Sequence, residues 1–354
     1  MKIPSTVTSA LVALKAARCP EDIFGAAPAD WLNEYRAWAK LVHEDVVKVK
    51  DKAAAHEAFL LLTKWRDQAE AKVAASTYGD SKPSVLATLR TKTAAYDLVE
   101  LIEAGDIADL YHGECAGKVT LVKVCRNAAN NDLMKTEADI LAMLPAKLDP
   151  KHAVYFPSLL DSFEVPQGAA KVRVNVFGAL PDGAVSLAAV RERYPDGIDP
   201  KDAAWMWNRM LEALHLLHVE GYVHANVTPD RFLIVPSTHQ GILTDFCYAR
   251  KVGQPAKAIS PGWKAGYPKD LLDKKSLDFG VDLHLSAHCM NTLLGGYWGV
   301  PIQNRGVPVA IAGLLRACWL GAAHRPKSAK ALHADFKEVR KGLGWKQGFR
   351  PFTL

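Results

Sequence analysis

The stretch from Gly221 to Ala249, GYVHANVTPDRFLIVPSTHQGILTDFCYA, constrains the fold of this 354-residue chain more than any other segment. It contains two short apolar runs, RFLIV and GILTDF, which are typical of short β-strands. The preceding segment, AAWMWNRMLEALHLLHVEGY, carries apolar residues at helical spacing and predicts a buried helix that starts at Pro200. His224 precedes the first run, and Asp245 lies near the end of the second.

The order of these residues resembles the catalytic core of eukaryotic-type protein kinases, which reads His-Arg-Asp-x-x-x-x-Asn, two short strands and Asp-Phe-Gly. His224, Asp245 and Phe246 match that pattern. Asn226 stands at the position of the catalytic Asp, and an amide cannot take a proton from a hydroxyl at neutral pH. Arg231 stands at the position of the metal-binding Asn, and the Gly of the last motif is a cysteine. The resemblance implies a retained core that has lost its general base and its second metal site.

Short β-type runs from Tyr96 onward, YDLVELI, IADLYHGE and VTLVKVC, predict the strands of a small lobe. In the kinase resemblance Lys123 is the lysine that contacts the α and β phosphates of ATP, and Glu137 on the following helix is its partner. Of the family's Gly-x-Gly-x-x-Gly flap only Gly105 survives. Glu103 would bring a negative charge near the phosphates, which opposes anion binding.

The kinase resemblance extends over residues 96–340 with its motifs in the family's order. It implies an α+β, bilobal fold, with a small antiparallel β lobe that carries one helix, a larger helical lobe, and a hinge near Phe177 and Gly178. Arg325 matches the family Arg that pairs with a Glu after the activation segment. Lys269 follows Pro268 here, so that pair survives only if Asp270 substitutes. The expected organisation is a helical domain over 1–80, a linker over 81–95, the kinase-like domain over 96–340 and a basic tail over 341–354.

Residues 28–74 show helical periodicity and predict two helices joined around His43-Glu44-Asp45. This region resembles a J-domain, the co-chaperone module that carries His-Pro-Asp between two helices. In J-domains the tripeptide and a basic face on the preceding helix stimulate ATP hydrolysis by a heat-shock chaperone. Here Arg36 and Lys40 would supply the basic face. The family's proline fixes the shape of the loop. A glutamate replaces it here, so a helical hairpin that serves only for packing or docking stays an alternative.

The net charge of +6 is confined to one end of the chain. Residues 325–354 hold eight Lys or Arg against two acidic residues, and the two signs balance elsewhere. We expect a solvated last helix and a frayed tail rather than a nucleic-acid site, because aromatic residues do not alternate with the basic ones along a groove.

The composition is that of a globular protein, and it indicates a cytoplasmic location. The six cysteines are scattered without a Cys-x-x-Cys pair, which favours reduced thiols. No apolar run reaches the roughly twenty residues that span a bilayer. Lys15 and Arg18 interrupt the amino-terminal apolar stretch, unlike in a secretory signal.

These observations predict a pseudokinase that binds a protein partner and a nucleotide without efficient phosphoryl transfer. Two alternatives stay open: a weakly active ATP-dependent protein kinase, and a co-chaperone adaptor that acts through the J-like hairpin. ATP is the candidate cofactor. Asp245 is the retained candidate metal ligand, and the replacement of the other ligand by Arg231 argues against a Mg²⁺ site. Leu233 would lie beneath the adenine and Leu121 would partly fill its pocket. The combination of the two domains resembles gene products of tailed bacteriophages.

Overall fold

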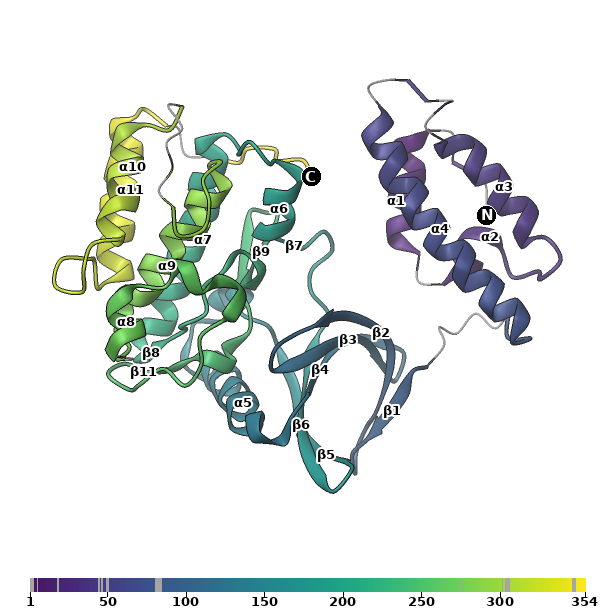
Figure 1. Ribbon diagram of the computed structural model, residues 1–354, viewed down its shortest axis with the longest axis horizontal. Coiled ribbons are helices and arrows are strands. Elements are labelled where there is room, and N and C mark those ends of the chain that lie inside the picture. The colour runs from purple at the N-terminus through teal and green to yellow at the C-terminus, as the bar shows by residue number, and fades with distance from the viewer. Residues whose placement is uncertain are drawn as a thin grey trace. The chain divides into compact units, whose positions relative to one another are not determined.

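The computed structural model describes the chain except residues 1, 2, 5, 18, 44, 46, 49, 50, 80–84, 275, 301, 303–305, 346 and 347. The chain divides into two compact units, residues 1–86 and residues 87–354. Figure 1 shows the two units as a group of helices and a larger body that contains both strands and helices. Each unit has a hydrophobic core of its own.

The first unit is helical. Its helices are α1 (Val7–Ala16), α2 (Pro20–Phe24), α3 (Trp31–Val42) and α4 (Lys52–Ala74). The core between them contains large side chains from all four helices: Leu14, Phe24, Trp38, Leu62 and Trp65. The indole N–H of Trp65 donates to the carbonyl of Leu14 over 3.1 Å, which ties α4 to α1. The amino-terminal apolar stretch therefore forms part of this core.

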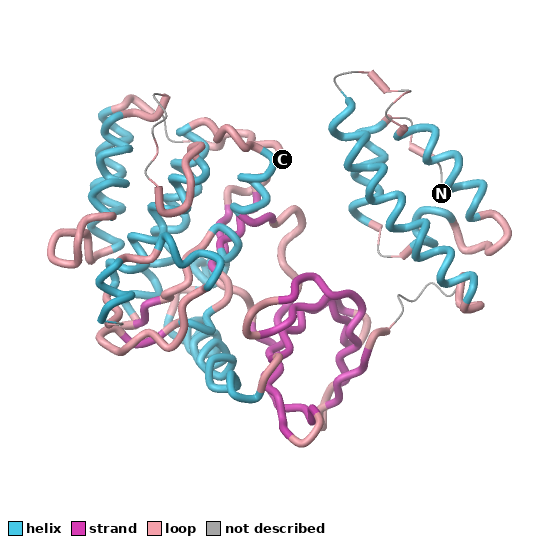
Figure 2. The backbone as a smooth tube through the Cα atoms, viewed as in Figure 1, coloured by secondary structure: helices cyan, strands magenta, loops and turns pink. Residues whose placement is uncertain are grey.

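The second unit begins with an antiparallel sheet, whose strands are magenta in Figure 2. The strands are β1 (Ala87–Arg90), β2 (Ala95–Ala104), β3 (Ala108–Cys115), β4 (Lys118–Cys125), β5 (Leu159–Gln167) and β6 (Ala170–Gly178). Their spatial order is β1-β2-β3-β4-β6-β5. Helix α5 (Asn131–Lys147) lies in sequence between β4 and β5 and packs against β5 and β6. The segment 81–95 was expected to be a linker, but it contains strand β1. Residues 87–90 pair with residues 95–98 in a short hairpin.

The rest of the second unit is mainly helical. Its elements are β7 (Val185–Ser186), α6 (Leu187–Arg193), α7 (Pro200–Val219), β8 (Tyr222–Val223), β9 (Phe232–Val235), β10 (Gln240–Leu243), β11 (Arg250–Lys251), α8 (Lys269–Lys274), α9 (Phe279–Leu293), α10 (Val309–Cys318) and α11 (Ala329–Gly342). Helix α9 is buried from Gly280 to Leu293 and packs against α7 and α10. Strands β9 and β10 form the hairpin predicted from the two apolar runs.

A carboxylate on the buried helix α9 holds the loop that follows β8. Asp282 accepts hydrogen bonds from the backbone N–H groups of His224 at 2.7 Å and Ala225 at 2.8 Å. The imidazole Nε2 of His218 on α7 lies 2.9 Å from the same carboxylate. Ala225 has a positive φ of 61°, a conformation uncommon outside glycine. The loop shape therefore depends on Asp282.

Arg325 fixes the segment before α9. Its guanidinium donates to both carboxylate oxygens of Asp270, at 2.8 and 3.0 Å, and to Asp278 at 3.0 Å. Its side chain is buried, so these charge-assisted contacts replace its hydration. Asp270 thus substitutes for the family's Glu, and the pair survives although the residue after Pro268 is a lysine.

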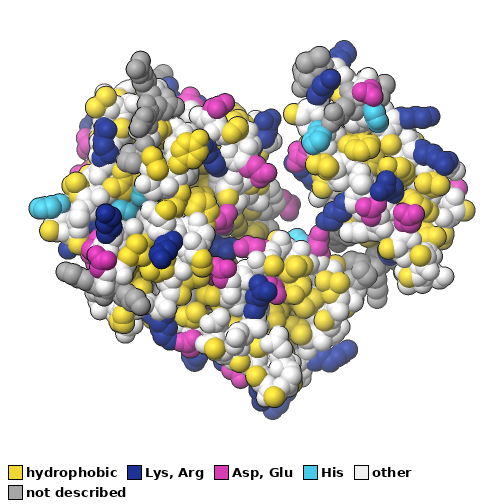
Figure 3. All heavy atoms as spheres, in the orientation of Figure 1, with side chains coloured by type: hydrophobic (Ala, Val, Ile, Leu, Met, Phe, Trp, Pro, Cys, Tyr) yellow, Lys and Arg dark blue, Asp and Glu magenta, His cyan; other side chains and the backbone are white. Residues whose placement is uncertain are grey.

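The end of the chain packs on the helical part of the second unit and differs from the frayed tail expected from its charge. Arg350 donates to Asp202 on α7 at 2.9 Å and forms an ion pair with Asp199 at 3.2 Å. The ring of Phe349 stacks on His239, and that of Phe352 contacts Tyr194 and Trp205. Basic residues that suggested an exposed segment instead neutralise acidic residues of the same unit. Figure 3 shows both signs of charge interspersed on the visible face of this unit.

Among the described residues, no helix combines the length and the apolar character that crossing a bilayer requires.

The docked tail predicts a measurable contribution to stability. Replacing Arg350 and Phe352 together by Ala should lower the free energy of unfolding by about 1–2 kcal/mol, because a partly exposed ion pair and a half-buried ring are lost. Urea unfolding would measure the change. Lys341→Ala, at an exposed position of α11, is the control and should leave stability unchanged. Equal stability of the double variant and the wild type would contradict tail docking.

Candidate functional site

A cleft of about 460 Å³ lies within the second unit, where the sheet meets the helical part. The volume falls in the range of small-molecule sites. We call the cluster of ion pairs around Lys123 and Arg231 the charged end of the cleft, and the hydrophobic part of its lining the apolar end. The apolar lining includes Ile107, Leu110, Leu121, Phe177, Leu180 and Leu233, and the charged lining includes Glu103, Asp106, Lys123, Glu137, Asp230, Arg231 and Asp245.

The ammonium group of Lys123, on β4, is at the centre of the charged end. Its Nζ lies 2.9 Å from Glu137 on α5 and 2.7 Å from Asp245 in the loop after β10. The thiol of Cys247 lies 3.2 Å away. Burial disfavours the charged lysine, but Asp245 and Glu137 outweigh that effect and raise its pKa well above the ordinary value. One cation therefore joins a strand, the next α-helix in the chain and a loop whose Asp245 is 122 residues from Lys123.

Glu137 is itself held in place by two further donors. The side-chain amide of Asn175, on β6, donates to its second carboxylate oxygen over 3.0 Å. The backbone N–H of Phe246 donates to the first over 3.1 Å. Asn175 was not singled out from the sequence, although a lone asparagine in the apolar run KVRVNVF is an available signal. A buried amide in such a strand requires partners, and Glu137 supplies one.

Both oxygens of Asp245 are engaged by protein groups. Lys123 occupies Oδ1, while Arg231 at 3.0 Å and the Asn226 amide at 3.2 Å occupy Oδ2. Burial would raise the pKa of Asp245, but the charges of Lys123 and Arg231 reverse that effect and hold it well below the usual range. The residue has a positive φ of 64°. Asp245 is thus a fixed anion already surrounded by donors.

Arg231 reaches across the cleft from the loop before β9 to the end of β2. Its guanidinium donates to both oxygens of Glu103, at 2.9 and 2.7 Å, in the two-pronged geometry that suits arginine and carboxylate. Burial lowers the pKa of Arg231, but Asp245 and Glu103 raise it by more. From the sequence, Glu103 was expected near the phosphates and Arg231 at the position of the family's metal-binding Asn. An ion pair between Glu103 and Arg231 was not predicted.

Gly105 serves the turn between β2 and β3. Its backbone N–H donates to the carbonyl of Ala108 over 3.1 Å, and a Cβ at this position would lie 2.6 Å from that carbonyl oxygen. The residue lines the cleft. A tight turn therefore accounts for the glycine without any phosphate.

The base position is covered by the chain. Asn226 is 2 % exposed. The hydroxyl of Tyr267 donates to the carbonyl of Ala225 at 2.9 Å and lies 3.5 Å from the Asn226 amide oxygen. The indole N–H of Trp263 donates to Asp230 over 2.7 Å. The segment after Asp245 thus folds back over the loop that would present an acceptor hydroxyl in an active kinase.

His224 has a packing role. Its Nε2 lies 3.0 Å from the carbonyl oxygen of Thr244, and its ring meets that of Phe246 edge-on at 4.8 Å. Phe246 in turn contacts Phe156 at 5.9 Å. Burial lowers the pKa of His224, so the imidazole is neutral at pH 7. These three rings are linked by edge-to-face contacts in the core.

The residues expected around an adenine lie at the apolar end. Leu121 on β4 is largely buried and Leu233 lies on β9, and both line the cleft together with Phe177 of the expected hinge. Leu121 therefore narrows the space without closing it.

Mg²⁺ does not fit the charged end as the described residues form it. Glu137, Asp245 and Cys247 have ligand atoms within 4.8 Å of one another, but the Lys123 ammonium lies among them. The guanidinium of Arg231 takes the remaining oxygen of Asp245. Magnesium requires several free oxygen ligands at about 2.1 Å. Side-chain cations hold the places that such an ion would need.

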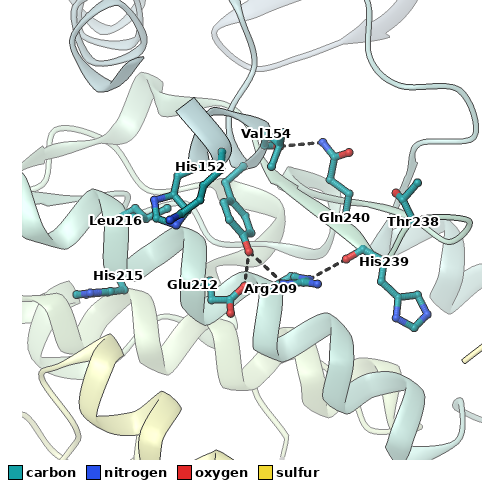
Figure 4. Close-up of a pocket in the computed structure, with 11 residues that line it drawn as sticks. His152, Val154, Arg209, Glu212, His215, Leu216, Thr238, His239 and Gln240 are labelled. Atoms are coloured by element: carbon teal, nitrogen blue, oxygen red, sulfur yellow. Dashed lines mark hydrogen bonds and ion pairs between the residues drawn. The ribbon is translucent and has the colours of Figure 1, made fainter. Parts of the chain in front are cut away.

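A second pocket, of about 610 Å³, lies at the surface of the helical part near α7 (Figure 4). Its polar groups are largely paired with each other. Arg209 donates to Glu212 at 2.9 Å and to the carbonyl of His239 at 2.8 Å, and Tyr155 donates to the same glutamate. The pocket contains none of the residues singled out from the sequence, and the cleft is the better candidate.

Comparisons with known proteins bear on the fold. No protein-family model matches the sequence, and no curated protein does. A solved structure described as the crystal structure of BubR1 kinase domain superposes with a TM-score of 0.57, covering 77% of this chain and 91% of that one. The chain contains a protein kinase-like fold. The sequence identity of 15% supports the likeness of fold alone.

The J-like residues lie on the first unit. Arg36 and Lys40 are exposed on α3, and His43 and Asp45 are exposed just after it. The backbone N–H of Asp45 donates to His43 Nδ1 at 3.3 Å. Residue 44, expected to replace the J-domain proline, lies outside the described residues.

The buried tie at Lys123 predicts a large effect of its removal. Lys123→Ala should lower the free energy of unfolding of the second unit by about 3–5 kcal/mol, because two buried carboxylates lose their counter-ion. Lys135→Ala is the matched control, since that lysine pairs with Asp139 on the surface of α5 and is 58 % exposed. Its effect should stay within about 0.5 kcal/mol. Urea unfolding measures both, and equal effects would contradict a structural tie.

Proposed function

We propose that the kinase-like domain is a pseudokinase, a binding module that holds a protein partner and a nucleotide-sized ligand without efficient phosphoryl transfer. The engagement of Asp245 carries the proposal. In an active kinase this carboxylate binds the metal that neutralises the transferred phosphate. Here Lys123, Arg231 and Asn226 already occupy its two oxygens.

Two further observations support the proposal. The amide at the base position cannot accept a proton, which by itself costs about 10²- to 10⁴-fold in rate. That amide also lines the cleft but is only 2 % exposed, and the Tyr267 hydroxyl lies 3.5 Å from its oxygen, which restricts the access of an acceptor hydroxyl. Loss of the base, of metal ligation and of access act on the same step.

The proposal predicts no phosphate transfer to a protein acceptor. The full chain is incubated with labelled ATP, Mg²⁺ or Mn²⁺ and a generic acceptor protein. The acceptor should incorporate no more label than it does with heat-denatured chain. Asn226→Asp should not restore turnover, because Arg231 still occupies the second ligand position. An active protein kinase in parallel is the control. Metal-dependent turnover that Asp245→Ala abolishes would overturn the proposal and favour a weakly active ATP-dependent kinase.

A second candidate function, a co-chaperone adaptor, is favoured by one observation on the first unit. Arg36 and Lys40 are four residues apart on α3 and both exposed, and His43 follows three residues later. Residues at this spacing share one helix face. The basic face and the His43/Asp45 turn are therefore available together to a heat-shock chaperone.

This candidate predicts that the full chain stimulates the ATPase of a heat-shock chaperone. Replacing His43 and Asp45 by Ala should remove the stimulation in a steady-state ATPase assay. Asp67→Ala, which changes another exposed acid of the same unit, is the control and should leave it intact. A wild-type chain that gives no stimulation would exclude the adaptor function.

A further inference from the structure

The ion pairs of the two cations in the cleft, Lys123 and Arg231, differ in how much of their side chains is buried. Lys123 is 12 % exposed, and its partners Glu137 and Asp245 are comparably buried. Arg231 is 25 % exposed and Glu103 is 42 % exposed. A buried pair is costly to separate, whereas a pair with a half-exposed carboxylate contributes little. The inner pair is therefore permanent, and the outer pair is the one that can exchange.

The outer pair bridges the mouth of the charged end. Glu103 lies near the end of β2, just before the turn at Gly105, and Arg231 lies in the short helical turn before β9. The two residues are 128 positions apart in sequence. Both line the cleft, as do Leu121 and Leu233 at its apolar end. The Glu103 carboxylate thus occupies the guanidinium fork that faces the cleft.

A phosphate group can replace this carboxylate without leaving Arg231 unpaired. Phosphate presents two oxygens to the guanidinium in the same two-pronged geometry. The exchange returns a half-exposed carboxylate to water, where its hydration offsets the lost contact. A divalent cation has no part in it, because the guanidinium already supplies the positive charge beside Asp245.

We propose that the cleft binds a nucleoside di- or triphosphate without a metal ion, and that Glu103 is an internal latch which the phosphate must displace from Arg231. This inference rests on the proposed non-catalytic function and adds the ligand class and its regulation. The apolar end takes the base, and the fork of Arg231 takes the phosphate. The ion pair between Glu103 and Arg231 keeps the affinity for the nucleotide low until Glu103, on β2, moves away from Arg231.

The test measures nucleotide binding by titration calorimetry of the full chain in EDTA. Glu103→Gln should raise the affinity for ATP and ADP by roughly fivefold, the factor expected when a partly exposed competing ion pair is removed. Adenosine should show no such gain, since it carries no phosphate. Arg231→Lys keeps the charge but not the fork, and should lose the gain when combined with Glu103→Gln.

The matched control is Glu164→Gln, which breaks a similar pair with Arg173 on the sheet, 2.9 Å long and remote from the cleft residues. It should leave nucleotide affinity unchanged. Unfolding temperatures confirm that each variant is folded. Unchanged or weaker binding by Glu103→Gln, an equal gain with adenosine, or a requirement for Mg²⁺ would overturn the latch. Phosphate transfer by the wild type would instead overturn the proposed function, so the two failures are distinguishable.

Discussion

The buried ammonium of Lys123 holds the second unit in one arrangement. It joins β4, α5 and the loop after β10 through Glu137 and Asp245, and Asn175 on β6 orients Glu137 from behind. Each of these groups would be costly to bury alone. Because every partner depends on the others, the sheet cannot move away from the helical part without exposing or isolating a charge. The geometry of the cleft follows from this constraint.

The same charges set this kinase-like fold apart from the arrangement that phosphoryl transfer uses. In phosphoryl transfer, a lysine, a carboxylate and metal ions neutralise the phosphates. In this chain Lys123 and Arg231 neutralise Asp245, Glu137 and Glu103. The groups that would act on a ligand act on one another. What remains for a ligand is the apolar end and the cation closest to solvent, which suits binding better than turnover.

Much of this arrangement was accessible from the sequence. The order of the strand with Lys123, the helix with Glu137 and the motif at Asp245 predicted an ionic tie, and the structure brings both carboxylates within 3 Å of the Lys123 Nζ. Asp270 was named as the one acid that could keep the pair with Arg325 after the family's Glu is lost, and the structure shows that pair. These successes rest on residues whose places the backbone of the fold determines.

The contacts that were missed depend on side chains meeting across long sequence separations. Glu103 and Arg231 were each identified, but their pairing depends on how far the β2–β3 turn leans over the cleft. The tail was expected to fray, because its charge was read without the acids Asp199 and Asp202 that face it. Strand β1 was assigned to a linker, since four residues show too little alternation to predict a strand.

Two residues that flank the cleft, Ala225 and Asp245, hold left-handed backbone although neither is glycine. Such conformations are strained, by about 1–3 kcal/mol each, and persist only where the surroundings enforce them. Asp282 enforces the first and Lys123 the second. Both of these contacts are part of the packing of the second unit. The strained backbone beside the cleft is therefore maintained by packing alone and needs no reaction to preserve it.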